Sequence, residues 1–370
     1  MYAGPGSGML PHFASQGFEC PRTTNPADFA LDLITVDLQR AENEVATRTR
    51  VQSFIERWNS EKAPRPAEST IATPAELGSL KRSMARFTVA FPILVHRAVI
   101  NLSRQPPLIL ARIMQVVGLG IISALYFAPL KNDYYSVQTR MGFIQEIAPL
   151  YFVGMLNNVA VYPNEKATFY SEHDDRAYGV EAFFLQYSVI EIPFEIVTSL
   201  IFAVLADMAV GLPRTAQMFF IVAFNCFCIV SCGESLGILF NTLFQHTGFA
   251  VNITSVFLSV AQTMGGTMSL NIPGFLQAFN HLSPVKWLVG NLAPYSLRGQ
   301  TFTCTAAQRL PDGHCPIETG QQVLELYNLD KNPGLNILAL GVCALVYRFV
   351  AYLVLKAKRE RWSWRVWKKL

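Results

Sequence analysis

The residues best suited to catalysis lie in one charged segment, "PNEKATFYSEHDDRAYG", which runs from Pro163 to Gly179 between two long apolar runs. Its His173 and Asp174 could act as a general base and its orienting acid, as in a membrane-embedded acyltransferase. Such an enzyme also needs a nucleophile site and a pocket, and the surrounding sequence supplies neither. The segment is therefore better interpreted as the solvated face of a short helix, with Asn164 as its N-cap and Glu165 favouring its positive N-terminal end.

Two further patterns suggest cofactor chemistry, and both are weakened by their context. Cys226, Cys228 and Cys232 could bind a soft metal, but they lie in an apolar run without a histidine cluster, so we expect packed thiols and no metal site. The glycine-rich "GPGSGM" lacks the lysine of a phosphate-binding loop, and the dipeptide Gly-Lys occurs nowhere in the chain. We therefore expect no catalytic site and no bound cofactor in this sequence.

The elements that carry these residues are predicted to be membrane helices. Of the 370 residues, 51% are hydrophobic and 15% are charged, whereas globular proteins carry about 25% charged residues. The formal net charge of +4 is too small and scattered for a nucleic-acid-binding protein. Six apolar runs are each close to the roughly 20 residues that cross a bilayer, which predicts an all-α, multi-pass integral membrane protein. These runs are 108–130, 141–162, 182–210, 215–240, 248–270 and 335–355.

Basic residues near the ends of the apolar runs predict the orientation of the helices. Residues 81–107 alternate apolar and basic side chains, which is typical of an amphipathic helix at the membrane surface; an ordinary soluble helix is the alternative. The chain after residue 355 is also strongly basic. Both termini and the segment 163–181 are therefore predicted to lie on the cytosolic side, with the loop 271–334 on the other side.

This long outer loop, 271–334, is too interrupted by Pro and Gly to span the bilayer. We expect short helices at the membrane surface, with Trp287 and Tyr295 as interfacial anchors. Within the loop, Cys304 and Cys315 could form a disulfide, which the non-cytosolic side permits. Two free thiols are the alternative.

Several motifs together resemble the ABCG, or White, family of ATP-binding cassette transporters. "ECPRTTNPADFALDLITVD" resembles the segment after the ATPase core, "FTVAFPILVHRAVINLSRQP" the connecting helix, and "VYPNEKATFYSEHDDRAYGVEAFF" the first cytosolic loop with its flanking spans. The detail around "YFVGMLNN" and "ITVD" is most similar to fungal members in which two halves are fused. The resemblance implies a remnant of the nucleotide-binding domain, with its last strands and a linker, over 1–80. A connecting helix over 81–107 and a six-span ABC-2 type transmembrane domain over 108–370 would follow.

The resemblance also implies which residues contact the ATPase and the substrate. The loop between the second and third spans would be the coupling helix, seated against the nucleotide-binding domains. Substrate would bind along the second and fifth spans, at the axis of a dimer. Where some members close the pathway with a leucine pair, this chain has Gly265 and Gly266, so that valve is altered or absent, and Met264 or Met268 could substitute for it. The implied coupling residues are Glu165, Lys166, Phe169, Glu172 and His173, and the implied pathway residues are Leu150, Val153, Asn157, Val256, Ser259 and Gln262.

The function that the resemblance implies is export of lipids, sterols or amphipathic drug-like molecules, driven by ATP and Mg²⁺ in nucleotide-binding domains that this sequence lacks. The partners would be those domains, membrane lipid, a hydrophobic small-molecule substrate and a second transmembrane half, as a homodimer, a heterodimer or a fused chain. A truncated gene model or a C-terminal fragment of a longer transporter would explain the missing domains. One alternative is a truncated, non-transporting subunit that regulates full-length partners, and another is an acyltransferase-like enzyme using His173 and Asp174. The plasma membrane and a vacuolar or other internal membrane are equally compatible with the sequence.

Overall fold

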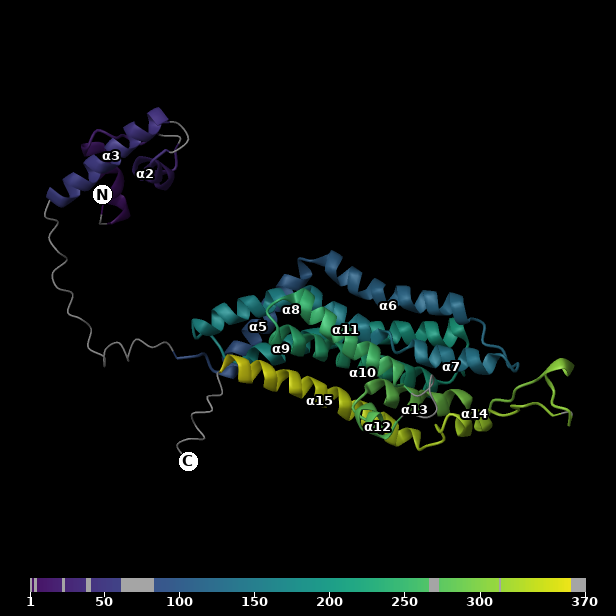
Figure 1. Cartoon of the computed structure of the whole chain (residues 1–370). Coiled ribbons are helices and arrows are strands. Elements are labelled where there is room, and N and C mark those ends of the chain that lie inside the picture. Colours follow the sequence, from purple (N-terminus) through teal and green to yellow (C-terminus); the bar gives the residue numbers. More distant parts are fainter. Residues whose placement is uncertain are drawn as a thin grey trace. The chain divides into compact units, whose positions relative to one another are not determined.

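The chain consists of two compact units, Met1–Lys81 and Arg82–Leu370. In both units the described residues form helices and no strand (Figure 1). The predicted all-α class is therefore confirmed. The computed structural model describes residues 2, 5–21, 24–37, 41–60, 83–265, 273–312 and 314–360.

The N-terminal unit is a small helical cluster. Asn25 is the N-cap of α2, because its side chain accepts a hydrogen bond from the N–H of Ala27. Phe13, Leu33 and Phe54 bring the three helices together in a shared core. Strands were expected here as the end of an ATPase core, and this expectation is wrong for the described residues of the unit. Its elements are a 3-10 turn, η1 (Gly6–Gly8), and α1 (Met9–Ser15), α2 (Pro26–Ile34) and α3 (Ala41–Ser60).

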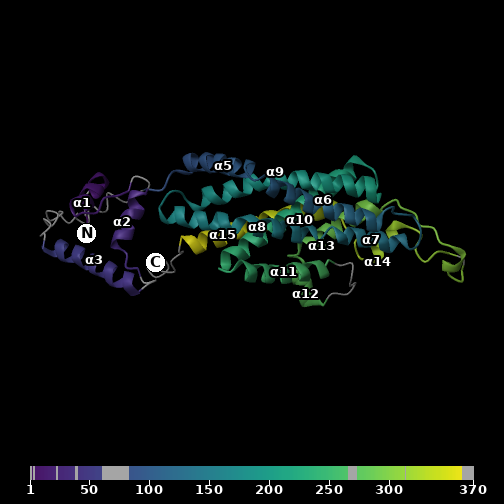
Figure 2. The same cartoon turned by 90° about the horizontal axis from the view of Figure 1, so that it is seen from above.

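The second unit is a bundle of long helices. In both views α8, α10 and α15 run alongside one another (Figures 1 and 2). Seen from above, α11 lies at one edge of the bundle (Figure 2). Its long helices are α5 (Phe87–Ser103), α6 (Pro106–Phe127), α7 (Ser136–Glu146), α8 (Leu150–Asp174), α9 (Val180–Leu205), α10 (Ala216–Leu243), α11 (Thr247–Thr263) and α15 (Pro333–Arg359). The shorter elements are a π-helical turn η2 (Ala206–Val210), α12 (Gly274–Asn280), α13 (Pro284–Leu297), η3 (Ala306–Gln308) and α14 (Gly320–Leu326).

Four of these helices are long and apolar enough to cross a membrane, namely α6, α9 with η2, α10 and α15. They correspond to the first, third, fourth and sixth predicted spans. The second predicted span is divided, because the helix breaks after Glu146 and resumes at Leu150, directly after Pro149. The fifth corresponds to α11, which has 17 residues and ends at Thr263.

The centre of the bundle is α10, which packs against α8, α9, α11, α13 and α15. Glycines let α8 and α10 approach closely, since a Cβ on Gly154 would lie 2.1 Å from the carbonyl oxygen of Val230. On the facing helix, Gly233 and Gly237 form a Gly-x-x-x-Gly pair, and a Cβ on Gly233 would lie 2.0 Å from the carbonyl oxygen of Tyr151. Small residues at this spacing are how membrane helices bring their backbones into contact.

The charged segment of the sequence is the end of α8 and not a separate short helix. The helix continues through Pro163 and ends at Asp174, so Asn164 is an interior residue and not an N-cap. This corrects the predicted cap. The reversal to α9 follows at once, with Arg176 in the left-handed region at φ 54°. The charges therefore lie on the C-terminal part of one long, continuous helix.

The opposite end of the bundle carries the long loop. α13, expected at the membrane surface, is mostly buried among the helices, and Lys286, Trp287 and Tyr295 are its partly exposed residues. Cys304 and Cys315 form a disulfide with their Cα atoms 5.9 Å apart. This loop also pairs with the turn after α6, because the N–H of Thr303 donates to the carbonyl of Asn132 at 2.9 Å.

Candidate functional site

The charged end of α8 is held by neighbouring helices. Arg97 of α5 donates to Glu172 at 2.5 Å, and the Tyr178 hydroxyl donates to the same carboxylate. Burial alone would raise the pKa of Glu172, but the hydrogen bonds from Arg97 and Tyr178 lower it below its ordinary value. Beneath this pair, Phe169 stacks on Phe183 with ring centroids 4.2 Å apart.

His173 and Asp174 contact a cation and do not form a catalytic pair. Arg359 of α15 donates from Nε to His173 Nδ1 at 3.1 Å, and it also forms an ion pair with Asp174. Burial and the neighbouring Arg359 lower the pKa of His173, while the hydrogen bond from Arg359 lowers the pKa of Asp174. A guanidinium cannot serve as a nucleophile or exchange protons near neutral pH. This geometry favours a structural clamp over the acyltransferase alternative.

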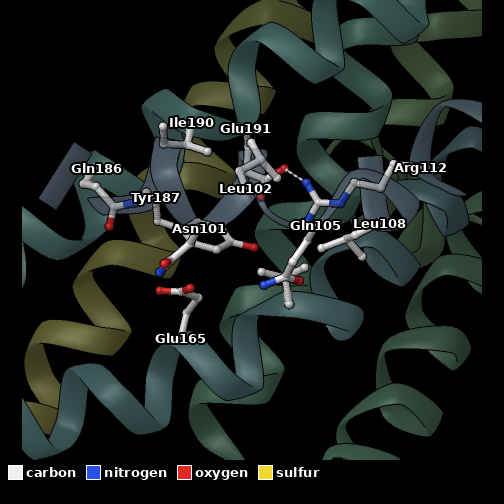
Figure 3. A pocket seen from close by; sticks show the side chains of 12 residues that line it. Asn101, Leu102, Gln105, Leu108, Arg112, Glu165, Gln186, Tyr187, Ile190 and Glu191 are labelled. Atoms are coloured by element: carbon white, nitrogen blue, oxygen red, sulfur yellow. Dashed lines mark hydrogen bonds and ion pairs between the residues drawn. The ribbon is translucent and has the colours of Figure 1, made fainter. Parts of the chain in front are cut away.

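The two remaining predicted coupling residues also face other parts of the chain. Lys166 donates from Nζ to the carbonyl of Asn241 at 2.6 Å, at the end of α10. Glu165 is half-buried and lines a cavity (Figure 3). Burial raises the pKa of Glu165, with Arg97 opposing this shift and Glu172 adding to it.

The expectation that all five coupling residues face an ATPase is therefore only partly compatible with the fold. Phe169 is fully buried, so for this residue the expectation is wrong. Glu172, His173 and Lys166 are engaged within the chain. A different set of residues is exposed to solvent at the same end of the helix, and we call this set the exposed stripe of α8. Its members are Asn164, Ala167, Thr168 and Ser171 of α8 and the C-cap residue Asp175.

A second group of charges lies deep in the bundle, between helices that can span a membrane. Arg112 of α6 and Glu191 of α9 form an ion pair at 2.5 Å, with both side chains almost fully buried. Arg348 of α15 contacts Glu234 of α10 at 2.7 Å and Glu195 of α9 at 3.3 Å. Charges at this depth are costly unless they are paired, so they mark functional or strongly structural positions.

These ion pairs were not predicted from the sequence, although the sequence carries a signal for them. Glu191 and Glu195 interrupt the third apolar run four residues apart, so they share a face of one helix. Arg112 and Arg348 are isolated cations in otherwise apolar runs. Isolated charges of opposite sign in different apolar runs indicate that buried ion pairs exist. Which arginine pairs with which glutamate cannot be read from the spacing alone.

The structure separates the predicted pathway residues. Val256 and Ser259 are exposed on α11, and Val153 is partly buried against the core. Leu150 is fully buried, so it cannot line an open path in this conformation. Asn157 lines a small cavity of about 10 Å³ beside the buried charges, away from the exposed face of α11.

The predicted valve position lies where α7 meets the end of α11. Gln145 donates from Nε2 to the carbonyl of Gln262 at 2.8 Å. Gly265 is buried, and a Cβ there would lie 2.8 Å from Gln145 Oε1 and 3.0 Å from Val285 Cγ1. The absent side chain is therefore what allows these segments to touch. Met264 is half-buried, and Gly266 and Met268 lie outside the described residues.

The cysteines of α10 do not form a metal centre. Cys226, Cys228 and Cys232 are buried free thiols. Among the residues that the structure describes, no group of three or more His, Cys, Asp or Glu side chains is placed to hold a metal ion.

Comparison with known proteins bears on the role of this bundle. Residues 89–293 match the protein family described as "ABC-2 type transporter". The chain is 39% identical, over 96% of its length, to an ABC transporter ATP-binding protein/permease of Saccharomyces cerevisiae, of which it covers 28%. It is 25% identical to ATP-binding cassette sub-family G member 5 of Rattus norvegicus, over 96% of the chain and 56% of that protein. It is 23% identical to Protein white of Drosophila melanogaster, over 97% of the chain and 53% of that protein. The chain thus spans between about a quarter and just over half of the length of these relatives.

Proposed function

This chain belongs to the ABC-2 type transporter family, and we propose that it is the membrane-spanning half of an exporter powered by nucleotide-binding domains that bind ATP and Mg²⁺. The substrates would be lipids, sterols or amphipathic drug-like molecules. A second transmembrane half, separate or fused, would complete the pathway.

The observation that carries this proposal is the continuity of α8. The helix has 25 residues, and at about 1.5 Å per residue it is roughly 37 Å long. One end bears the exposed stripe, and the other packs on α10 through Gly154 and Gly233. A displacement of the stripe would therefore be transmitted along α8 to its contact with α10, because the helix continues through Pro163 and no loop separates the two ends.

The end of α8 is also linked to three other helices. Arg97 attaches it to α5, Arg359 to α15, and Lys166 to the last turn of α10. Each link is a charge-assisted hydrogen bond, which is stronger than a neutral one. A force applied at this end would thus reach several helices together, as alternating access requires.

We place the ATPase contact on the exposed stripe of α8, and we assign the coupling residues Glu172 and His173 to holding that stripe in position. The stripe consists of small or polar side chains, which suit a wet, separable contact between domains. On this assignment the exposed stripe of α8 faces the cytosol, because the ATPase domains that contact it would lie on the cytosolic side of the membrane.

We propose that the pathway lies at the exposed face of α11. Val256, Ser259 and Val260 are exposed on this helix, which lies at the edge of the bundle (Figure 2). A second half packed here would enclose an apolar surface fit for a hydrophobic substrate. This arrangement keeps Val256 and Ser259 as pathway residues and removes Leu150.

Substitution on the exposed stripe tests the proposal, in the complete transporter that carries this chain. Thr168→Arg places a bulky charge at the proposed ATPase contact, and we expect substrate-stimulated ATP hydrolysis and export to fall at least fivefold. Thr139→Arg is the control, because Thr139 is a partly exposed helical threonine that, like Thr168, hydrogen-bonds to the carbonyl four residues earlier. Both variants should insert in the membrane normally. Normal coupling in the Thr168→Arg protein would refute the placement of the contact.

A further inference from the structure

A partly open cavity of about 70 Å³ lies where α5, α6, α8 and α9 meet. It is bounded by the last turn of α5 and the first turns of α6, so it lies where the connecting helix turns into the first span. This is the level at which head groups meet acyl chains if α5 lies at the membrane surface. The volume holds several groups of the size of a water molecule, since one needs about 10–15 Å³.

The wall of the cavity is divided by polarity. One part is apolar and includes Leu102, Leu108 and Ile190. The other carries the side-chain amides of Asn101 and Gln186 and the carboxylate of Glu165, and Figure 3 shows these polar groups directed toward a common space. A cavity with a few polar groups in an apolar wall is typical of a site for a small amphipathic ligand.

Charge matching indicates the sign of the ligand. The Arg112 guanidinium at the cavity is already paired with Glu191 at 2.5 Å, and Arg97 nearby is paired with Glu172 at 2.5 Å. Glu165 makes no ion pair within the part of the chain that the structure describes. The five ionised groups carry two positive and three negative charges, so a cation would complete the site.

The surroundings indicate an apolar tail. α6 buries only 22% of its most apolar stretch inside the bundle, and Leu110 and Met114, in the turns next to the cavity, are exposed. A ligand whose head group lies in the cavity would therefore extend its chain along a helix surface suited to lipid.

We propose that this cavity binds the protonated amino group of a long-chain amphipath, with Glu165 as its counter-ion and the amides of Asn101 and Gln186 as hydrogen-bond acceptors. The site is distinct from the pathway proposed at α11. It goes beyond the exporter function, because binding requires neither ATP nor a second half.

The test is photolabelling of the purified full chain in phosphatidylcholine nanodiscs. The probe is a diazirine-bearing C16 primary amine, compared with the C16 alcohol and the C16 carboxylic acid that carry the same diazirine. We expect the amine to label peptides of α5, α6, α8 and α9 at least tenfold more efficiently than the acid. Equal labelling by all three probes would overturn the proposal.

Variants identify the counter-ion. Glu165→Gln should weaken amine labelling about tenfold, as expected for loss of a charge-assisted hydrogen bond, and leave alcohol labelling unchanged. Asp312→Asn, which neutralises an exposed acid on the disulfide-closed loop, should change neither. Unchanged amine affinity in Glu165→Gln refutes the assignment.

Two further arms address folding and the source of the ligand. Leu102→Trp fills the cavity, so it should abolish labelling by amine and alcohol alike while the thermal unfolding of the protein stays cooperative. Competition by nanodiscs that contain phosphatidylethanolamine would support a membrane lipid as ligand, whereas competition by a soluble alkylamine alone would support an amphipath from outside the membrane. Because labelling is measured without ATP, these results are independent of the outcome with Thr168→Arg.

Discussion

The buried ion pair between Arg112 and Glu191 gives the sharpest prediction on stability. Together with Arg348, Glu195 and Glu234, it forms a cluster of two guanidinium groups and three carboxylates, whose net charge is −1 when all five are ionised. Removing Arg112 changes this net charge to −2, whereas neutralising Glu191 changes it to zero. The two single substitutions should therefore differ, although they break the same pair.

The magnitudes follow from the cost of an unpaired buried charge. Arg112→Met leaves Glu191 without its partner among other carboxylates, and we expect a loss of about 3–5 kcal/mol in the free energy of unfolding. Glu191→Gln retains a hydrogen-bond acceptor for Arg112, so we expect a smaller loss of about 1–3 kcal/mol. The double variant Arg112→Met/Glu191→Leu removes both charges, and replacement of a buried pair by apolar side chains is often close to neutral. We expect it to lose about 1 kcal/mol or less.

The measurement is unfolding of the chain in mixed micelles by increasing mole fractions of sodium dodecyl sulfate, followed by the loss of helical circular dichroism. A double-mutant cycle, with Glu191→Leu as the second single variant, gives the coupling energy of the pair. A double variant that loses as much as the sum of its singles would show that the pair is not coupled. Greater damage from Glu191→Gln than from Arg112→Met would contradict the charge count.

Two other substitutions test the packing of α8 against α10 and the Arg97–Glu172 ion pair. Gly154→Ala should cost about 1–3 kcal/mol by overpacking against α10, whereas Gly118→Ala, which meets nothing within 4 Å, should be neutral or slightly stabilising in the same unfolding assay. For the Arg97–Glu172 ion pair, the lowered pKa of Glu172 means that its contribution to stability is fully present above its unfolded pKa of about 4.5 and is lost as the pH falls through the lower folded value. Acidification from pH 6 to pH 4 should therefore lower the melting temperature of the wild type more than that of Glu172→Gln, and equal shifts would contradict this.

Much of the fold follows from the sequence because a bilayer constrains it strongly. Apolar length alone identifies α6, α9, α10 and α15, since each must satisfy its backbone internally while crossing lipid. The all-α class follows for the same reason. The break before Pro149 was not predicted, because hydropathy does not register a helix break inside an apolar run.

The site was predicted less well, and the reason is geometric. Sequence patterns place charges along one element, whereas the end of α8 is held by Arg97 of α5 and Arg359 of α15. The register of each helix decides whether a side chain faces in or out. Phe169 was assigned to an interface from the resemblance to the family's coupling helix, yet its position on α8 turns it toward Phe183.

The geometry of α8 also limits how an ATPase could act on the proposed pathway. Gly154 is in backbone contact with α10, which makes the crossing of the two helices the natural pivot. Thr168 lies 14 residues beyond this pivot and Leu150 four residues on its other side, so the two arms are about 21 Å and 6 Å long. On the proposed function, a push at the exposed stripe would be reduced about threefold at Leu150 and would reach α7 through the break before Pro149. A tight α8–α10 contact is therefore as necessary for coupling as the charged end of the helix. If this contact were loose, α8 would slide along α10 instead of rotating about Gly154, and the push would not move Leu150 in a defined direction.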